Sequence, residues 1–239
     1  MAAALAASSA GADVLLVERD TRLGGILPQC IHNGFGLHRY SEELTGPEYA
    51  QRDIEALHHS DVEIQCGTFA LELSQNDDLF SILLVSTGSA RRQLSRSVVL
   101  AMGCRERTAG AISLPGARPA GIYTAGAAQR MMNIQNLSVG RSAVIVGSGD
   151  IGLIMARRLT LEGASVEGVY EILPRPSGHT RNIVQCLNDY GIPLHLSTTI
   201  SEIKGKKRVT GVVVQKVDEK REPIPGTERE VACDTVILS

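Results

Sequence analysis

Three glycines with the spacing of a phosphate-binding turn lie in the second half of the chain, in Gly147–Gly152 (GSGDIG). The strand-like run Ser142–Val146 precedes them, and an apolar helical segment over 149–162 follows. The first glycine permits a tight turn, the second lets a pyrophosphate approach the backbone, and the third lets helix and strand pack closely. Free N–H groups and the positive end of the helix dipole attract phosphate. The pattern predicts a dinucleotide-binding turn, and a glycine turn without a ligand is the alternative.

An acid follows this turn at the distance expected of a ribose-binding residue. Glu171 ends the next strand-like run, about 20 residues after the glycines. A carboxylate there accepts hydrogen bonds from ribose hydroxyls and repels a 2′-phosphate, so the sequence favours NAD over NADP. Arg175 stands close enough to meet a 2′-phosphate, which keeps NADP open as an alternative.

A second acid, Glu18, ends a strand-like run over 13–18 that follows a small-residue helix over 2–10. This is the layout of the second half of another dinucleotide-binding unit. Gly24 and Gly25 come shortly afterwards, where glycine lets the backbone approach a cofactor closely. A surface glutamate at a strand end is the alternative, and the spacing alone favours neither interpretation.

Cys30 is the one candidate nucleophile, with His32 two residues away as its base. We favour the simpler interpretation of a packed cysteine and a solvated histidine. The five cysteines, at positions 30, 66, 104, 186 and 233, form no CxxC pair. They predict reduced thiols in a cytoplasmic protein rather than a disulfide framework, and their spacing predicts no metal site.

The elements that must position these residues fall into two halves. Over 1–117, a helix, a strand and a second helix precede a β-rich stretch whose last strand is expected over 93–101. A Pro- and Gly-containing connector places the domain boundary near residue 117. Over 118–239, strands and helices alternate as βαβαβ, which predicts a parallel sheet with right-handed crossovers. We therefore expect an α/β protein with two Rossmann-like dinucleotide-binding domains, the first of them incomplete.

Composition excludes several classes of function. Apolar residues make up 43% and aromatic residues 3% of the chain, which suits a core of buried parallel strands. The net charge of −2 favours binding neither to nucleic acid nor to an anionic membrane. The basic runs Arg91–Arg96 and Lys204–Arg208 are interpreted as solvated hairpin edges. No apolar run is long enough to cross a bilayer.

Taken together, the motifs resemble those of the FAD- and NAD-dependent pyridine nucleotide–disulfide oxidoreductase superfamily. Over essentially the whole chain, the residues that carry this resemblance are LVERDTRLGG, VVLAMGCRER and VIVGSGDIGLIMARRL, in that order. The branch related to sarcosine oxidase alpha, opine oxidase and hydrogen cyanide synthase subunits is similar in LPQCIHNGFGLHRYSEELTGPEYA and GCRERTAGAISLPGARPAGIYTAGAAQ.

The resemblance implies roles for particular residues. It implies that Glu18 recognises the FAD ribose, that the backbone at Gly24 and Gly25 contacts FAD, and that Phe69 lies near the adenine. Ala101-Met102-Gly103 would form the turn that closes over FAD. NAD would meet the remaining set: Gly147, Gly149, Asp150, Ile151, Gly152 and Glu171.

The sequence departs from the superfamily in three ways. The paired redox cysteines are missing, so dithiol exchange is not expected. The first strand and glycine loop of the FAD domain are missing, and the chain stops on a strand at Leu238-Ser239. We therefore expect a fragment truncated at both ends that retains FAD poorly.

The expected function is hydride transfer between NAD(H) and FAD. A small amine, amino-acid or polyol-type substrate, or a partner redox subunit, would be the other redox partner. Two alternatives stay open. One is a thiol-dependent NADH oxidoreductase working through Cys30, and the other is an NAD-binding or subunit-interaction module without turnover.

Overall fold

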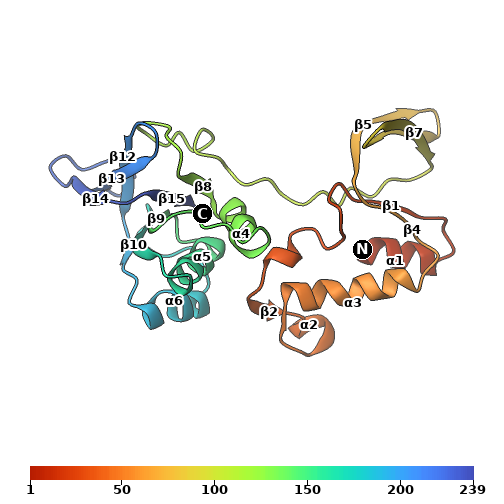
Figure 1. Ribbon diagram of the computed structural model, residues 1–239, viewed down its shortest axis with the longest axis horizontal. Helices are drawn as coiled ribbons and strands as arrows, with labels where there is room; N and C mark the ends of the chain where they lie inside the picture. The colour runs from red at the N-terminus through yellow and green to blue at the C-terminus, as the bar shows by residue number, and fades with distance from the viewer. The chain divides into compact units, whose positions relative to one another are not determined.

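The computed structural model describes the backbone of residues 1–239 and every side chain except that of Asn76. The chain divides into two compact units, unit 1 (Met1–Cys104) and unit 2 (Arg105–Ser239), whose elements are labelled in Figure 1. The sequence predicts a boundary near residue 117, whereas the contacts assign the segment before it to unit 2. The reason is that Leu114 is buried in the core of unit 2.

Unit 2 is built on a five-stranded sheet. Its strands are β8 (Ile122–Thr124), β9 (Ser142–Val146), β10 (Ser165–Tyr170), β11 (Leu194–His195) and β15 (Thr235–Leu238). They lie in the order β11-β10-β9-β15-β8 and all neighbours are parallel, which confirms the predicted parallel sheet. The strand order reverses at β9, because β10 lies on one side of it and β15 on the other. In open parallel sheets, ligands bind beyond the carboxyl ends of the strands at such a point.

Helices cover one face of this sheet, as Figure 1 shows. They are α4 (Ala125–Asn133), α5 (Asp150–Leu161), α6 (Thr180–Cys186) and the short 3-10 helix η2 (Asn188–Tyr190). Ile145 of β9 and Ile237 of β15 are fully buried and pack with Leu153 of α5 in one core cluster. This packing holds the start of α5 against the carboxyl end of β9.

The other face of the parallel sheet carries an antiparallel sheet of three strands. These are β12 (Thr198–Gly205), β13 (Val209–Lys216) and β14 (Arg229–Ala232). Val144 and Val236, which alternate with the residues facing the helices, join Ile200 and Val212 in a second core cluster. Both faces of the parallel sheet are therefore buried, as its near-continuous apolar strands require.

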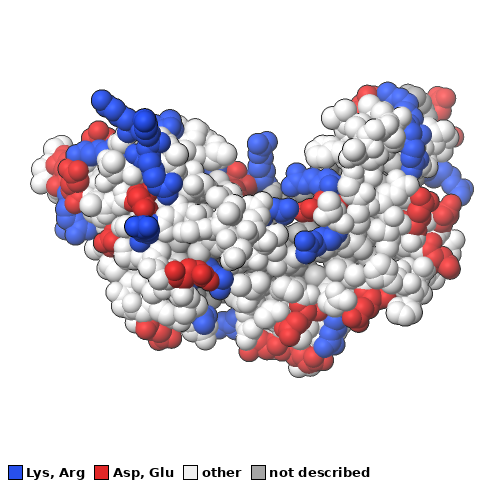
Figure 2. All heavy atoms as spheres, viewed as in Figure 1, with Lys and Arg blue, Asp and Glu red and all other residues white. Residues whose placement is uncertain are grey.

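Basic side chains gather over the β12–β13 hairpin, with acidic side chains among them (Figure 2). Lys204 pairs there with Glu230 at 2.6 Å. In the other basic run, Arg92 lies on the edge strand β7 (Ser89–Ser95) and pairs with Glu72 at 3.3 Å. Both runs thus lie on hairpins, where charged side chains protect exposed strand edges. Within the described part of the chain, no helix has the length and apolarity needed to cross a membrane.

Unit 1 has a smaller core. Helix α1 (Ala2–Ser9) leads to β1 (Leu15–Val17), which pairs in parallel with β4 (Glu63–Gln65), and α3 (Gly46–His58) packs beside them. Ala4, Leu23, Leu57 and Val62 are the buried residues at the centre of this cluster.

The remaining elements of unit 1 surround this core. They are η1 (Leu27–Gln29), β2 (Asn33–Phe35), α2 (Leu37–Tyr40), β3 (Leu44–Thr45), and the antiparallel sheet of β5 (Thr68–Asn76), β6 (Leu79–Ser86) and β7. The strand predicted over 93–101 is wrong beyond Ser95, where β7 ends. In the described structure, Val99 and Leu100 belong to no strand, and their side chains are 71% and 62% exposed.

Candidate functional site

The glycine turn joins β9 to α5 at the point where the strand order reverses. Gly147 has φ +92°, and a Cβ there would lie 2.7 Å from the carbonyl oxygen of Ser239. Gly149 is the N-cap of α5, and a Cβ at Gly152 would lie 2.5 Å from the Ser239 side chain. At Gly147 and Gly152 the turn therefore packs too closely against the end of β15 for any residue larger than glycine.

The start of α5 offers backbone donors to an oxygen ligand. The first amides of a helix have no carbonyl four residues behind them, and they lie at the positive end of its dipole. One of them, the Gly152 amide, donates to the Ser239 hydroxyl at 3.0 Å. An oxygen acceptor thus already occupies one position at this helix start. Backbone, glycine spacing and strand order all fit a bound diphosphate.

The two polar side chains within the turn, Ser148 and Asp150, point to a different neighbour, the loop over 172–179, which we call the strap. Ser148 is fully buried; its hydroxyl accepts from the Ser177 amide at 2.9 Å, and its carbonyl accepts from the Gly178 amide at 2.8 Å. The strap therefore folds back onto the glycine turn.

Glu171 lies at the end of β10 beside the turn and is 4% exposed. Its Oε2 accepts from the Ser148 amide at 2.9 Å and from the Ser148 hydroxyl at 2.6 Å, while Oε1 accepts from the Leu173 amide at 3.0 Å. The structure thus brings Glu171 to the glycine turn. Its contacts in the described structure are to the protein itself.

Asp150, the first residue of α5, is also held by the strap and by α6. Its carboxylate accepts from the His179 amide at 2.8 Å and the Asn182 side chain at 2.8 Å, and lies 2.5 Å from His179 Nδ1. Partial burial raises the pKa of Asp150, but these hydrogen bonds outweigh it and hold the pKa below its ordinary value. The Asp150 side chain thus turns to His179, so only its backbone amide is available to a diphosphate. Ile151 packs against the helix-side core.

The candidate residues of unit 1 form a looser group. Glu18 follows β1, is half-buried, and accepts from the Asp20 amide at 2.8 Å through Oε1. The Glu18 carbonyl accepts from the Thr68 amide at 3.0 Å, which places Phe69, 49% exposed, next to this strand end. An acid beside an exposed aromatic ring is suited to an adenosine.

The other positions predicted to meet FAD differ in their packing. Gly24 has φ +115°, and a Cβ there would lie 2.8 Å from Pro28 Cγ, whereas Gly25 faces open space. Ala101, Met102 and Gly103 are exposed and irregular, and Met102 is 82% exposed. Within its described residues, unit 1 supplies an acid next to an exposed aromatic residue but no glycine turn between a strand and a helix. Its residues therefore fit FAD in part.

Cys30 lies in a packed position near η1. Its thiol donates to the Ile26 carbonyl at 3.4 Å, and burial raises the pKa of the thiol. His32 Nδ1 faces the Asn33 carbonyl at 2.9 Å, and its ring centroid lies 5.4 Å from that of Phe35. A thiol with a raised pKa is protonated at neutral pH and is a poor nucleophile.

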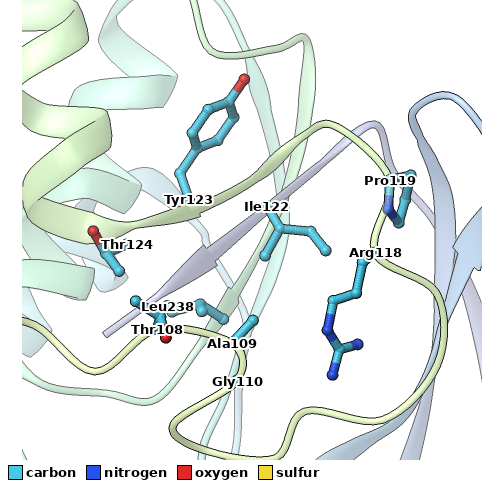
Figure 3. A pocket seen from close by; sticks show the side chains of 9 residues that line it. All are labelled: Thr108, Ala109, Gly110, Arg118, Pro119, Ile122, Tyr123, Thr124 and Leu238. Carbon is cyan, nitrogen blue, oxygen red and sulfur yellow. The ribbon is translucent and has the colours of Figure 1, made fainter.

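Sequence reasoning missed a cavity of about 320 Å³ in unit 2, on the sheet face opposite the helices. Figure 3 shows Ile122 and Leu238 on one side of the strands and the Tyr123 ring pointing away from them. Nearby, Glu106 accepts from the Gly126 amide at 2.7 Å and the Thr124 hydroxyl at 2.6 Å. Glu106 caps the start of α4 in this way, and only its place in the GCRER segment hinted at a role.

Comparison with known proteins gives a consistent result. The model of the pyridine nucleotide-disulphide oxidoreductase family matches residues 1–239. The chain is 25% identical over 254 aligned residues to an opine oxidase subunit of Agrobacterium tumefaciens, covering 100% of this chain and 49% of that protein. It is 26% identical over 257 residues to hydrogen cyanide synthase subunit HcnB of Pseudomonas aeruginosa, covering 100% and 53%. The chain spans about half the length of the curated relatives it matches.

Solved structures share the fold. Thioredoxin reductase of T. acidophilum aligns with a TM-score of 0.74 at 19% identity, covering 99% of this chain and 71% of that one. Thioredoxin reductase of Lactococcus lactis, in its FR conformation, aligns with the same TM-score and identity, covering 99% and 72%. The predicted α/β fold class with Rossmann-like dinucleotide-binding domains is confirmed.

Proposed function

Because the chain belongs to the pyridine nucleotide-disulphide oxidoreductase family, we propose that unit 2 binds NAD(H) at the Gly147–Gly152 turn. The observation that carries this proposal is the position of the turn. It joins β9 to α5 where the strand order reverses, and its glycines lie where a side chain would collide with Ser239. The diphosphate would be held by backbone amides from Gly149 to Ile151, and the ribose would lie toward the end of β10.

The second part of the proposal is hydride transfer between NAD(H) and FAD. A nicotinamide and a flavin supply this chemistry when both are bound, and the protein binds and orients them. The corner of unit 1 formed by Glu18 and Phe69 supports recognition of the FAD adenosine. In this proposal the side chains of the chain bind and orient the two cofactors and take no part in the transfer of the hydride.

A small amine, amino-acid or polyol-type substrate, or a partner redox subunit, would complete the reaction. Support comes from the curated relatives, which are named as subunits of an opine oxidase and of a hydrogen cyanide synthase. Both names describe proteins that work with other subunits. The same observation favours a second candidate function, in which this chain binds NAD and a partner subunit without turnover of its own.

Catalysis by the Cys30 thiol is the weaker alternative, because burial raises the pKa of that thiol. We also propose that the 239-residue chain alone retains FAD poorly, since unit 1 offers only the corner formed by Glu18 and Phe69. Stoichiometric flavin absorbance in the purified chain would overturn this part of the proposal.

Titration of the purified chain with NADH tests the coenzyme site directly. Gly147→Ala forces a residue with φ +92° against the Ser239 carbonyl and should weaken NADH binding by about tenfold or more, which corresponds to ~1.4 kcal/mol. Gly226→Ala is the matched control, because Gly226 has φ +82° but nothing within 4 Å of a Cβ. Absence of NADH binding by the unaltered chain, or equal losses in both variants, would refute the assignment.

A further inference from the structure

The glycine turn is clamped between two neighbours. On one side, the Cβ positions of Gly147, Gly149 and Gly152 face Ser239 at the end of β15. On the other side, the side chains of Ser148 and Asp150 bond to the strap. The glycines of the turn thus meet the end of β15, whereas its two polar side chains meet the strap.

The strap lies as close to the turn as β15 does. A Cβ at Gly178 would lie 2.7 Å from the Ser148 carbonyl oxygen and 2.7 Å from Leu153 Cδ1. The Gly178 amide donates to that same carbonyl at 2.8 Å. A side chain at position 178 would therefore prevent the strap from approaching the turn this closely.

The hydrogen-bonding capacity of Glu171 is almost used up within the protein. A carboxylate accepts about four hydrogen bonds, two at each oxygen. Oε2 accepts the amide and the hydroxyl of Ser148 and, at 3.4 Å, the Ser177 hydroxyl, while Oε1 accepts the Leu173 amide. One acceptor position therefore remains, on Oε1 of a side chain that is 4% exposed. A ribose diol offers two hydroxyl donors, so Glu171 in this arrangement can bind one of them at most.

We propose that Glu171 is a positioning residue that, with Ser148, fixes the glycine turn against the strap before coenzyme binds. This inference rests on the proposed function, because it assumes that the turn binds a pyridine nucleotide. A brace of this kind preorganises the amides of the turn and lowers the ordering cost of binding. It strengthens binding of NADH and NADPH alike. A ribose-reading carboxylate would instead favour NADH, because it repels the 2′-phosphate.

Three variants test the brace. Ser148→Ala removes a buried hydroxyl that bonds to Glu171 and Ser177, Gly178→Ala pushes the strap off the turn, and Glu171→Gln replaces an acceptor oxygen by a donor. Two of these changes weaken a hydrogen bond to the charged Glu171 group, and Gly178→Ala removes the close packing of the strap. Each should weaken NADH and NADPH binding by about tenfold, leaving the ratio of the two Kd values unchanged. In the coenzyme-free protein, hydrogen exchange of the amides over 148–152 and 173–178 should become faster in all three variants.

Ser165→Ala is the matched control, because the Ser165 hydroxyl also donates to a carboxylate, Glu167 Oε1 at 2.7 Å, at the opposite end of β10. It should change neither Kd nor exchange over those two segments.

A shift of about tenfold in the ratio of the NADH and NADPH Kd values in Glu171→Gln, with binding by Ser148→Ala and Gly178→Ala unchanged, would overturn the brace. If the unaltered chain binds neither coenzyme, the proposed function fails, while the exchange measurement still decides whether the brace exists. Should one variant fail to fold, the other two carry the test.

Discussion

The two units contain the same local arrangement in different surroundings. In unit 1, Gly11 (φ +82°) follows α1 and β1 leads to Glu18; in unit 2, Gly163 (φ +83°) follows α5 and β10 leads to Glu171. Each glutamate uses Oε1 to accept the amide two residues further on, at 2.8 Å in unit 1 and 3.0 Å in unit 2. The same order of elements, a helix, a left-handed glycine, a strand and an acid, thus occurs twice and gives the same local hydrogen bond each time.

The difference lies in what reaches the second carboxylate oxygen. In unit 2, Oε2 of Glu171 accepts both donors of Ser148, a residue of the turn that follows β9. Glu18 is half-buried, and β1 pairs with β4 in a sheet of two strands. The comparison teaches that the local sequence determines the position of the glutamate and its hydrogen bond to the amide two residues further on. A fixed, buried carboxylate needs in addition a glycine turn from the neighbouring strand.

The largest expected effect concerns the cores behind these two strand ends. Unit 2 buries both faces of its parallel sheet, whereas unit 1 has one small cluster, so we expect two unfolding transitions with unit 1 unfolding first. Leu57→Ala in unit 1 and Leu153→Ala in unit 2 each empty a fully packed position and should cost about 3 kcal/mol. Chemical denaturation, monitored through the hydrogen exchange of the amides in each unit, measures each transition.

Each leucine variant is the control for the other. Leu57→Ala should shift only the first transition, and Leu153→Ala only the second, because no core cluster contains both residues. A single transition that both variants shift equally would show that the two units unfold together, and the comparison of separate cores would be wrong.

A smaller effect is expected at the acids themselves. Glu171→Gln leaves the buried donors of Ser148 facing an amide group and should destabilise unit 2 by about 2 kcal/mol. Glu18→Gln removes a single half-exposed contact and should change the stability of unit 1 by about 0.5 kcal/mol or less. Denaturation midpoints of the two transitions measure both values. Equal costs in the two variants would mean that the neighbouring turn does not distinguish the two strand ends.

Part of this comparison could be predicted from the sequence. The turn at Gly147–Gly152 and the two acids at strand ends follow from short patterns, in which each residue is placed by its immediate neighbours. The assignment of coenzyme-binding roles to those residues stays a prediction. The strand expected over 93–101 is wrong beyond Ser95, because Val99 and Leu100 have apolar side chains typical of a strand but no neighbouring strand to pair with in the described structure.

The direction of the Glu171 carboxylate could not be predicted. It depends on Ser148, which is distant in sequence, and on Ser177, which belongs to an irregular loop. No periodicity describes such a loop, so neither its return to the turn nor the tight packing of Gly178 is visible in one sequence. Tertiary contacts alone decide whether an acid at a strand end faces a ligand or its own protein.

The last comparison concerns a buried thiol of each unit, whose effect on stability is confined to alkaline pH. Burial, reinforced by the negative charges of Asp234 and Glu167 and partly offset by a hydrogen bond from the Thr235 amide, raises the pKa of Cys233 in unit 2 from 9.0 to about 11. The unfolded chain therefore loses this proton at lower pH than the folded chain. Stability from the protonated thiol is complete below pH 9.0 and is lost as the pH rises to about 11.

The free energy of unfolding of unit 2, measured by the second transition, should accordingly decrease as the pH rises over that range. Cys233→Ala should make this decrease smaller. Cys30→Ala is the counterpart in unit 1, because burial raises the pKa of Cys30 as well. This variant should reduce the pH dependence of the first transition only. Denaturation series over the alkaline range, with alkylation of each thiol at matched pH, measure both slopes. An unchanged slope in Cys233→Ala would show that this thiol does not contribute to alkaline instability. A change in the first transition instead would show that the two cores are coupled, contrary to the separation on which the comparison rests.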